Sequence, residues 1–210
     1  MEATMTSADS CSTPKGEARR QRLLAAAREV FLDKGYAGAS VNDIVARAGG
    51  SLSTLYKLFG NKEGLFTAAL EAQASSVWCR LGQAGERPPQ EVLEELARDL
   101  IDLALPNANI RLIRGIAAEA ERAPELGALF LDHGPDRTRR ELAEYLRDQH
   151  ARGKLVVKDP RTSAGLFTGM VLGEWMLDSL VGRPPSLTLE ARDHRARYAT
   201  ELFLAGHAPT

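Results

Sequence analysis

Apolar residues recur along most of this chain every three or four positions, which is the spacing of side chains on one face of a helix. In the first periodic segment, about 16–34, these residues are Leu23, Leu24, Ala27, Val30 and Phe31. No segment alternates apolar and polar residues as a half-buried strand does, although the run 155–157 is short and β-prone. The pattern predicts an all-α fold of about nine or ten helices.

Capping residues and breakers divide this pattern into separate helices. Gly35 suits the position just after a helix, so the first helix should end there. Ser40 and Asp43 form a capping-box pair, and Ser51 and Asn61 suit the starts of the next two helices. Glycine and proline breakers then separate helices predicted at about 62–81, 89–104, 108–121, 124–131, 135–152, 160–182 and 187–205.

Two of the predicted helices are short and are joined by the small-residue turn 48–51. This arrangement predicts a helix-turn-helix, in which a third helix lies in the major groove of DNA and two others support it. An ordinary surface turn is the alternative for such a serine-rich, glycine-flanked helix. The residues expected to face inward in the three-helix unit are Leu23, Ala27, Val30, Phe31, Ile44, Val45, Ala48, Leu55 and Phe59.

The outward face of the third helix carries side chains suited to a DNA duplex. Serine and threonine hydroxyls reach base edges or phosphates, and Leu52 suits the methyl group of thymine. Lys57 and Lys62 suit phosphates as point charges, and amides at the starts of the second and fourth helices suit phosphates through the helix dipole. The predicted DNA-contacting residues are Ser40, Val41, Asn42, Ser51, Leu52, Ser53, Thr54, Tyr56, Lys57 and Lys62.

Charged residues are distributed unevenly along the chain, and this distribution is more informative about function than the net charge. The 210 residues carry a formal net charge of -1, which argues against a generally basic nucleic-acid binder, and 44% are hydrophobic, enough for a sizeable core. Between residues 15 and 62, however, nine residues are basic and four are acidic. A basic head on an acidic body is typical of a DNA-reading unit attached to a body that does not bind DNA.

Other functional classes have little support. Cys11 and Cys79 form neither a disulfide framework nor a metal site, which favours a reducing cytoplasm. Residues 1–14 indicate a disordered tail without the apolar segment of a signal peptide, and Glu174 and Asp178 interrupt the most apolar window, so no membrane partner is expected. The sequence has no phosphate loop, zinc-protease motif or Cys-x-x-Cys, so neither an enzyme nor a cofactor or metal is expected.

A dense series of short motifs runs through residues 16–66: Gly35-Tyr36, Ser40, Ile44-Val45, Ala48-Gly49, Thr54-Leu55-Tyr56, Phe59 and Lys62-Glu63-Gly64-Leu65. In this order and register, the motifs resemble the N-terminal domain of the TetR family of bacterial transcriptional regulators. The resemblance implies that Tyr56 and Lys62 contact phosphates, and that the C-terminal helices bind a small ligand and form a dimer. Gly50, where the family usually has valine, and Leu52-Ser53, where a Lys-Gly-like pair is usual, depart from the pattern.

The resemblance divides the chain into a tail (1–14), a DNA-binding domain (15–62) and a ligand-binding and dimerisation domain (63–210). Residues 111–182 also resemble, more broadly, the C-terminal domain of repressors related to multidrug-efflux control. A ligand pocket is expected to be apolar with a few polar groups, although core packing is the alternative for each candidate. The candidate pocket residues are Trp78, Leu100, Leu103, Ile113, Arg114, Phe130, Phe167, Met170, Glu174 and Trp175.

Three glycines at four-residue spacing, Gly165, Gly169 and Gly173, share one face of a predicted helix. Each costs about 1 kcal/mol of helix stability relative to alanine, so the stripe suggests the close approach of another backbone. The neighbour is expected to be a second subunit, with Tyr198 and Leu202 of the last helix as further interface residues. A contact within the chain, with the last helix, is the alternative.

Together these observations predict a cytoplasmic, homodimeric DNA-binding regulator, most simply a repressor that a small-molecule effector releases from a pseudo-palindromic operator. Two alternatives stay open. One is a ligand-insensitive or partner-controlled DNA binder with the same head. The other is an all-α enzyme whose scattered titratable residues gather only in the fold.

Overall fold

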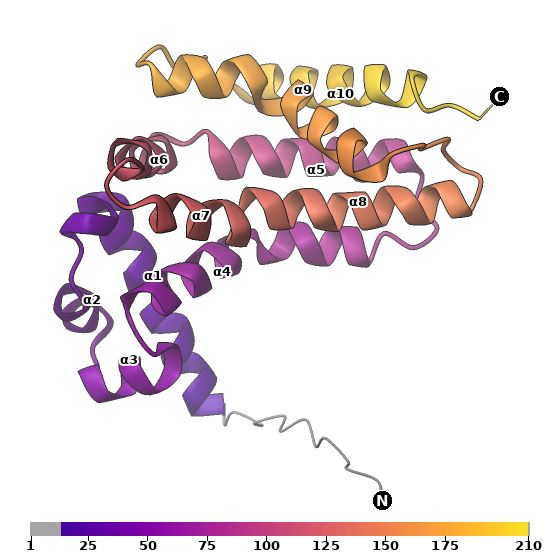
Figure 1. The fold of residues 1–210 in the computed structure, drawn as a ribbon. Coiled ribbons are helices and arrows are strands. Elements are labelled where there is room, and N and C mark those ends of the chain that lie inside the picture. Colours follow the sequence, from indigo (N-terminus) through magenta and orange to yellow (C-terminus); the bar gives the residue numbers. More distant parts are fainter. Residues whose placement is uncertain (1–13, 210) are drawn as a thin grey trace, which may run out of the picture.

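The computed structural model describes residues 14–209, and within this range the chain forms ten helices and no strand. The expected tail, with Cys11, lies outside the described residues apart from Pro14, where the first helix begins. A three-helix head lies at one end of a larger helical body (Figure 1). The helices are α1 (Pro14–Gly38), α2 (Val41–Ala48), α3 (Leu52–Phe59), α4 (Lys62–Gly82), α5 (Pro89–Ala104), α6 (Asn107–Glu119), α7 (Pro124–His133), α8 (Pro135–Ala151), α9 (Pro160–Leu180) and α10 (Leu189–Ala205).

Local signals account for the helix ends. Gly35 interrupts α1 with a φ of 70°, a left-handed conformation that glycine adopts without a Cβ clash. The Ser40 hydroxyl accepts a hydrogen bond from the Asp43 amide and the Asp43 side chain accepts one from the Ser40 amide, which completes the predicted capping box. The side chains of Ser51 and Asn61 cap α3 and α4, each by accepting a hydrogen bond from the backbone amide three residues further on. From α4 onward, the predicted ends agree with the structure to within about two residues.

The head is built around one hydrophobic cluster, called the head cluster below. Most of the residues predicted to face inward are buried in it, and Val45, Ala48 and Phe59 pack against it partly buried. The cluster also takes in the first turns of α4 and three residues of α6 and α7, namely Leu112, Ile116 and Leu126. Packing is therefore continuous across residue 62, where the sequence placed the boundary between the two domains.

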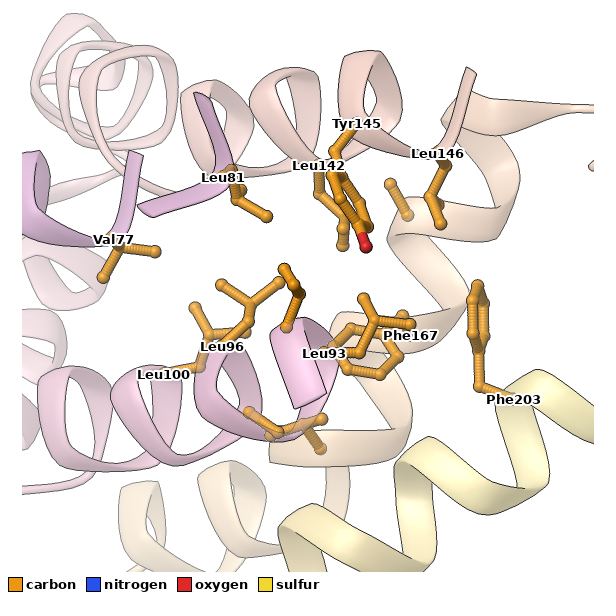
Figure 2. Packing of buried hydrophobic residues seen from close by; sticks show 14 of the residues in the cluster. Val77, Leu81, Leu93, Leu96, Leu100, Leu142, Tyr145, Leu146, Phe167 and Phe203 are labelled. Atoms are coloured by element: carbon orange, nitrogen blue, oxygen red, sulfur yellow. The ribbon is translucent and has the colours of Figure 1, made fainter. Parts of the chain in front are cut away.

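The body encloses a second and larger cluster. Side chains from α4, α5, α8, α9 and α10 point toward one another there, among them Leu96, Leu142 and Phe167, all fully buried (Figure 2). The ring of Phe167 meets that of Phe203 edge-on, with centroids 5.1 Å apart. Helix α4 supplies residues to both clusters, so it connects the head to the body. No helix of the described residues has the length and apolar character needed to cross a membrane.

An ion-pair network links the end of α4 to the middle of α5. The Glu95 carboxylate accepts hydrogen bonds from Arg87 at 2.7 Å and from Arg80 at 2.9 Å. These bonds lower the pKa of Glu95 to about 2, and the bond from Arg87 has the largest effect, although partial burial opposes them. A carboxyl whose pKa falls on folding stabilises the protein above its ordinary pKa, and this contribution is lost as the pH falls toward the lowered value.

We expect Glu95→Gln to lower the Tm at pH 7 by about 2–4 °C, because a half-exposed network of this kind contributes on the order of 1 kcal/mol. The difference between variant and wild type should shrink as the pH falls from 5 to 2. Thermal melts followed by circular dichroism test this, with the exposed Glu121→Gln as control. A difference that is constant over this pH range would show that the Glu95 charge does not stabilise the fold.

Candidate functional site

Helix α3 presents a largely exposed face to solvent. The exposed fractions of Leu52 and Tyr56 are 37% and 47%, and Ser53 and Lys57 are also exposed, while Leu55 on the opposite side is fully buried. Thr54 is half-buried. The outward face expected from the sequence is therefore accessible to a duplex. Leu58, which is not among the predicted DNA-contacting residues, is 40% exposed near the end of the helix.

Hydroxyl groups gather at the start of α3. The Ser51 hydroxyl caps the helix and lies 3.0 Å from the hydroxyls of both Ser53 and Thr54. Each hydroxyl has one donor and two acceptor positions, so these groups retain capacity for a phosphate or a base edge. The positive end of the helix dipole at the same place favours an anion.

The start of α2 differs from the expectation. The side chain and the amide of Ser40 both bond to the Asp43 carboxylate, so neither group is free to bind a phosphate. Lys34 pairs with the same carboxylate at 2.9 Å, and these bonds lower the pKa of Asp43 to about 2. Val41 packs its side chain against the head cluster, so only its amide is available, together with the exposed Asn42.

Lys62 holds the end of α1 against α4. Its ammonium lies 4.4 Å from the centre of the Tyr36 ring and 3.5 Å from the Ala37 carbonyl oxygen. Burial lowers the pKa of Lys62 and raises that of Tyr36. The ammonium is thus half-buried and positioned by a cation–π contact, a constraint that the sequence did not indicate.

No close contact within the described chain requires a glycine at position 50 of the turn, where the family usually has valine. Within the described residues, a Cβ built at Gly50 would meet no atom closer than 4 Å, so a larger residue would fit. Its neighbour Gly49 has a φ of 67°, which explains the glycine at that position. The departure at Gly50 therefore removes no Cβ contact from the turn.

The body contains a cavity of about 470 Å³, within the size range of small-molecule sites. Six helices, α4 to α9, line it, mostly with apolar side chains. Four of the candidate pocket residues lie on its wall: Leu100, Leu103, Ile113 and Phe130.

The other six candidates do not line the cavity. They pack in the core or bond to partners elsewhere in the chain. Phe167 is fully buried in the body cluster, and Met170 and Trp175 pack against that cluster. Glu174 pairs with Arg195 at 2.8 Å. The indole of Trp78 is buried, and its N–H donates to the Thr138 hydroxyl.

Arg114 connects two helices instead of lining the cavity. Its guanidinium donates to the carbonyl oxygens of Ser179 and Leu180 at the end of α9. Because carbonyls at a helix end lack partners within the helix, this side chain caps α9 from α6. Helix α6 also packs against α1 of the head, so it contacts both the ligand-binding part of the body and the head.

The residues predicted for the dimer interface fall into two groups. Tyr198 and Leu202 are more than half exposed on α10, and Leu166 and Leu177 of α9 are exposed as well. The three glycines of α9 instead line the cavity. A Cβ built at any of them would meet no atom of the described chain within 4 Å, so the alternative of a tight contact with the last helix is wrong.

Two family models match the chain, and together they cover most of it. Residues 23–69 match the model for bacterial regulatory proteins of the tetR family. Residues 91–209 match the model for the C-terminal domain of AefR-like transcriptional repressors. The first match contains the helix-turn-helix, and the second contains most of the helices that line the cavity.

Relatives of known sequence match either a segment or most of the chain. A segment of 71 residues is 41% identical to the HTH-type transcriptional activator FasR of Mycolicibacterium smegmatis, a match that covers 34% of this chain and only 32% of FasR. The matched part of the chain thus spans about a third of the length of FasR. Over 89% of this chain and 95% of the relative, it is 23% identical to the uncharacterized HTH-type transcriptional regulator YvkB of Bacillus subtilis.

Solved structures extend the similarity to nearly the whole chain. A TetR-family transcriptional regulator from Mesorhizobium loti is 28% identical, with a TM-score of 0.73 over 93% of this chain and all of the other. The flavonoid-responsive regulator FrrA is 31% identical, with a TM-score of 0.66 over 92% of this chain and 98% of FrrA.

Proposed function

We propose, because this chain belongs to the TetR family of bacterial regulatory proteins, that it is a homodimeric repressor that leaves its operator when a small molecule binds in the body. Membership of the family makes it a transcriptional regulator with an N-terminal DNA-binding domain. The observation that carries the rest of the proposal is that the wall of the cavity and the core of the head share residues. Leu70, Leu112 and Phe130 contact both.

For DNA binding, the exposed face of α3 enters the major groove, with Tyr56 and Lys57 directed outward. The hydroxyl group at the start of the helix and the amides at the start of α4 bind phosphates. Two heads related by a two-fold axis then contact half-sites whose centres lie about 34–36 Å apart, or a multiple of that distance. The apolar face of α9 and α10, with Tyr198 and Leu202, joins the two subunits.

For release, a ligand in the cavity favours one of two arrangements of the head on the body. It does so only to the extent that it binds one arrangement more tightly than the other. Helices α4 and α6 carry the difference, because each supplies residues to the cavity wall and to the head cluster. Since FrrA is described as flavonoid-responsive, flavonoids belong in the first panel of candidate effectors.

Selection of bound DNA from a random duplex library, at about 0.15 M salt, tests the proposal. We expect enrichment of an inverted repeat, because a two-fold dimer reads two equivalent half-sites. The operator obtained in this way then serves in titrations with the effector panel. Enrichment of a single unrepeated site would contradict the dimeric mode of binding, and enrichment of no sequence would contradict specific reading by α3.

Tyr56→Phe and Lys62→Ala are each expected to weaken binding to all DNA sequences, because the wild-type side chains contact phosphates, not bases. Lys62→Ala should also reduce the slope of log affinity against log salt by about one unit, since one phosphate contact is lost. Fluorescence anisotropy at several salt concentrations measures both effects, with Lys158→Ala of the body as control.

An altered sequence preference in Lys62→Ala would contradict the phosphate assignment. An unchanged salt slope with weaker binding would show that Lys62 acts only by holding Tyr36 in place.

A further inference from the structure

The cavity wall contributed by α9 has an unusual shape. Gly165, Gly169 and Gly173 lie on it at four-residue spacing, so three successive turns of the helix expose backbone there without side chains. Larger side chains line the other walls, among them Leu103, Ile113 and Phe130, and Leu172 and Met176 of α9 line the cavity as well. The glycines therefore leave a strip of the α9 wall without side chains, next to larger residues of the same helix.

Nothing in the described chain requires these glycines. A Cβ at each position would meet no atom of the described residues within 4 Å, and alanine is the better helix former. None of the three has the positive φ that calls for glycine. The space left beside α9 is thus the space of the cavity, which suits a molecule that lies flat against the helix.

The polar groups of the wall bond mostly to one another. The Thr138 hydroxyl donates to the Gly134 carbonyl and accepts from Trp78, and Thr168 donates to the carbonyl of Gly165. The Asn109 amide donates to the Leu103 carbonyl and accepts from Gln73 at 3.4 Å. The donors of the two hydroxyls are thus engaged within the protein, and a ligand finds a few acceptor positions and the remaining amide groups of Asn109 and Gln73.

Charge on the wall is neutralised within the protein. Arg139 is the charged residue of the lining, and its guanidinium donates to the Asp136 carboxylate. A cation in this apolar cavity would find no free carboxylate on the lining of the described chain, and an anion would compete with Asp136. A cationic ligand would therefore lose its hydration without a matching partner, and an anionic one would have to share Arg139 with Asp136.

We infer that the cavity binds an uncharged, flat and largely apolar molecule, which lies against the glycine wall of α9. This inference rests on the proposed control by a ligand and specifies the chemical class of that ligand. It assigns the glycine stripe to the ligand instead of to a second subunit.

Nile red, an uncharged planar fluorophore, and Nile blue, a cation with the same type of ring system, test the charge preference in the full-length protein. We expect saturable fluorescence enhancement with Nile red and an affinity for Nile blue that is lower by about tenfold or more. Equal or tighter binding of Nile blue would overturn the requirement for an uncharged ligand.

Gly169→Ala tests the flat wall. The variant should raise the Tm by about 2–4 °C through helix propensity, yet weaken Nile red binding by about tenfold because its methyl group occupies the ligand's space. The control is Gly115→Ala in α6, where an added Cβ also meets nothing and which does not line the cavity. It should raise the Tm and leave Nile red binding unchanged.

Three further outcomes distinguish the alternatives. Unchanged Nile red affinity in Gly169→Ala, with dissociation of the dimer by light scattering, would assign the glycines to the second subunit and overturn the inference. Displacement of Nile red by the compact, saturated 1-adamantanemethanol with equal affinity in wild type and Gly169→Ala would overturn the preference for flat ligands. If saturating Nile red leaves the operator affinity unchanged, this would count against the proposed control by a ligand. The inferred chemical class of the molecule that binds in the cavity would still hold.

Discussion

Gly64→Ala is expected to lower operator affinity by about 10- to 100-fold, through overpacking where α3 meets α4. A Cβ at this position would lie 2.1 Å from the carbonyl oxygen of Phe59, the last residue of α3. That oxygen also accepts a hydrogen bond from the Asn61 amide at 2.9 Å. Since backbone atoms cannot turn aside as a flexible side chain can, α3 has to move relative to α4.

The measurement is fluorescence anisotropy with the selected operator, accompanied by Nile red binding. Because the disturbance is confined to the head, the body of Gly64→Ala should still bind the dye with nearly wild-type affinity. Gly115→Ala, at an open helical position, is the matched control and should keep its operator affinity. Normal operator binding by Gly64→Ala would show that the position of α3 is not set by this contact.

Leu112→Ala is expected to have the largest effect on coupling between the two sites. Leu112 is 6% exposed, belongs to the head cluster and lines the cavity. Its truncation should cost about 2–5 kcal/mol of stability, or about 5–15 °C in Tm. Between two coupled sites, a ligand bound at one typically changes the affinity of the other by about 5- to 150-fold. In Leu112→Ala, the change in operator affinity caused by the ligand should fall toward none.

Leu142→Ala separates loss of stability from loss of coupling. Leu142 is fully buried in the body cluster and does not line the cavity, so the variant should lose similar stability but keep the response to ligand. Operator affinity with and without saturating Nile red gives the coupling in each protein. An equal response in both variants would show that Leu112 does not transmit the signal between cavity and head.

The helices and their ends follow from the sequence because they depend on neighbours along the chain. The capping box of Ser40 and Asp43 and the break at Gly35 involve contacts within a few residues, and both are present in the structure. The same holds for the buried side of α3, since the spacing of Leu55 and Phe59 defines the face that turns inward. The helix-turn-helix was therefore predictable almost residue by residue.

The roles of side chains in long-range contacts could not be predicted in this way. Lys62 was recognisable as a basic residue at the start of a helix, but not as a partner of the Tyr36 ring. Arg114 was a candidate pocket residue because it is a polar residue among apolar ones. Only the position of α9 shows that it caps that helix. Periodicity indicates which face of a helix is apolar, but not which other helix covers it.

The sequence alone determined that this is an all-helical protein with a DNA-reading head, because helix periodicity, caps and turn motifs are local. Only the tertiary structure decided that Gly169 faces a cavity, that Trp78 and Phe167 belong to the core, and that Leu112 contacts both head and cavity. The reason is that a cavity is space left unfilled between helices distant in sequence. Its existence depends on how several helix faces fit together, which no single segment of the chain encodes.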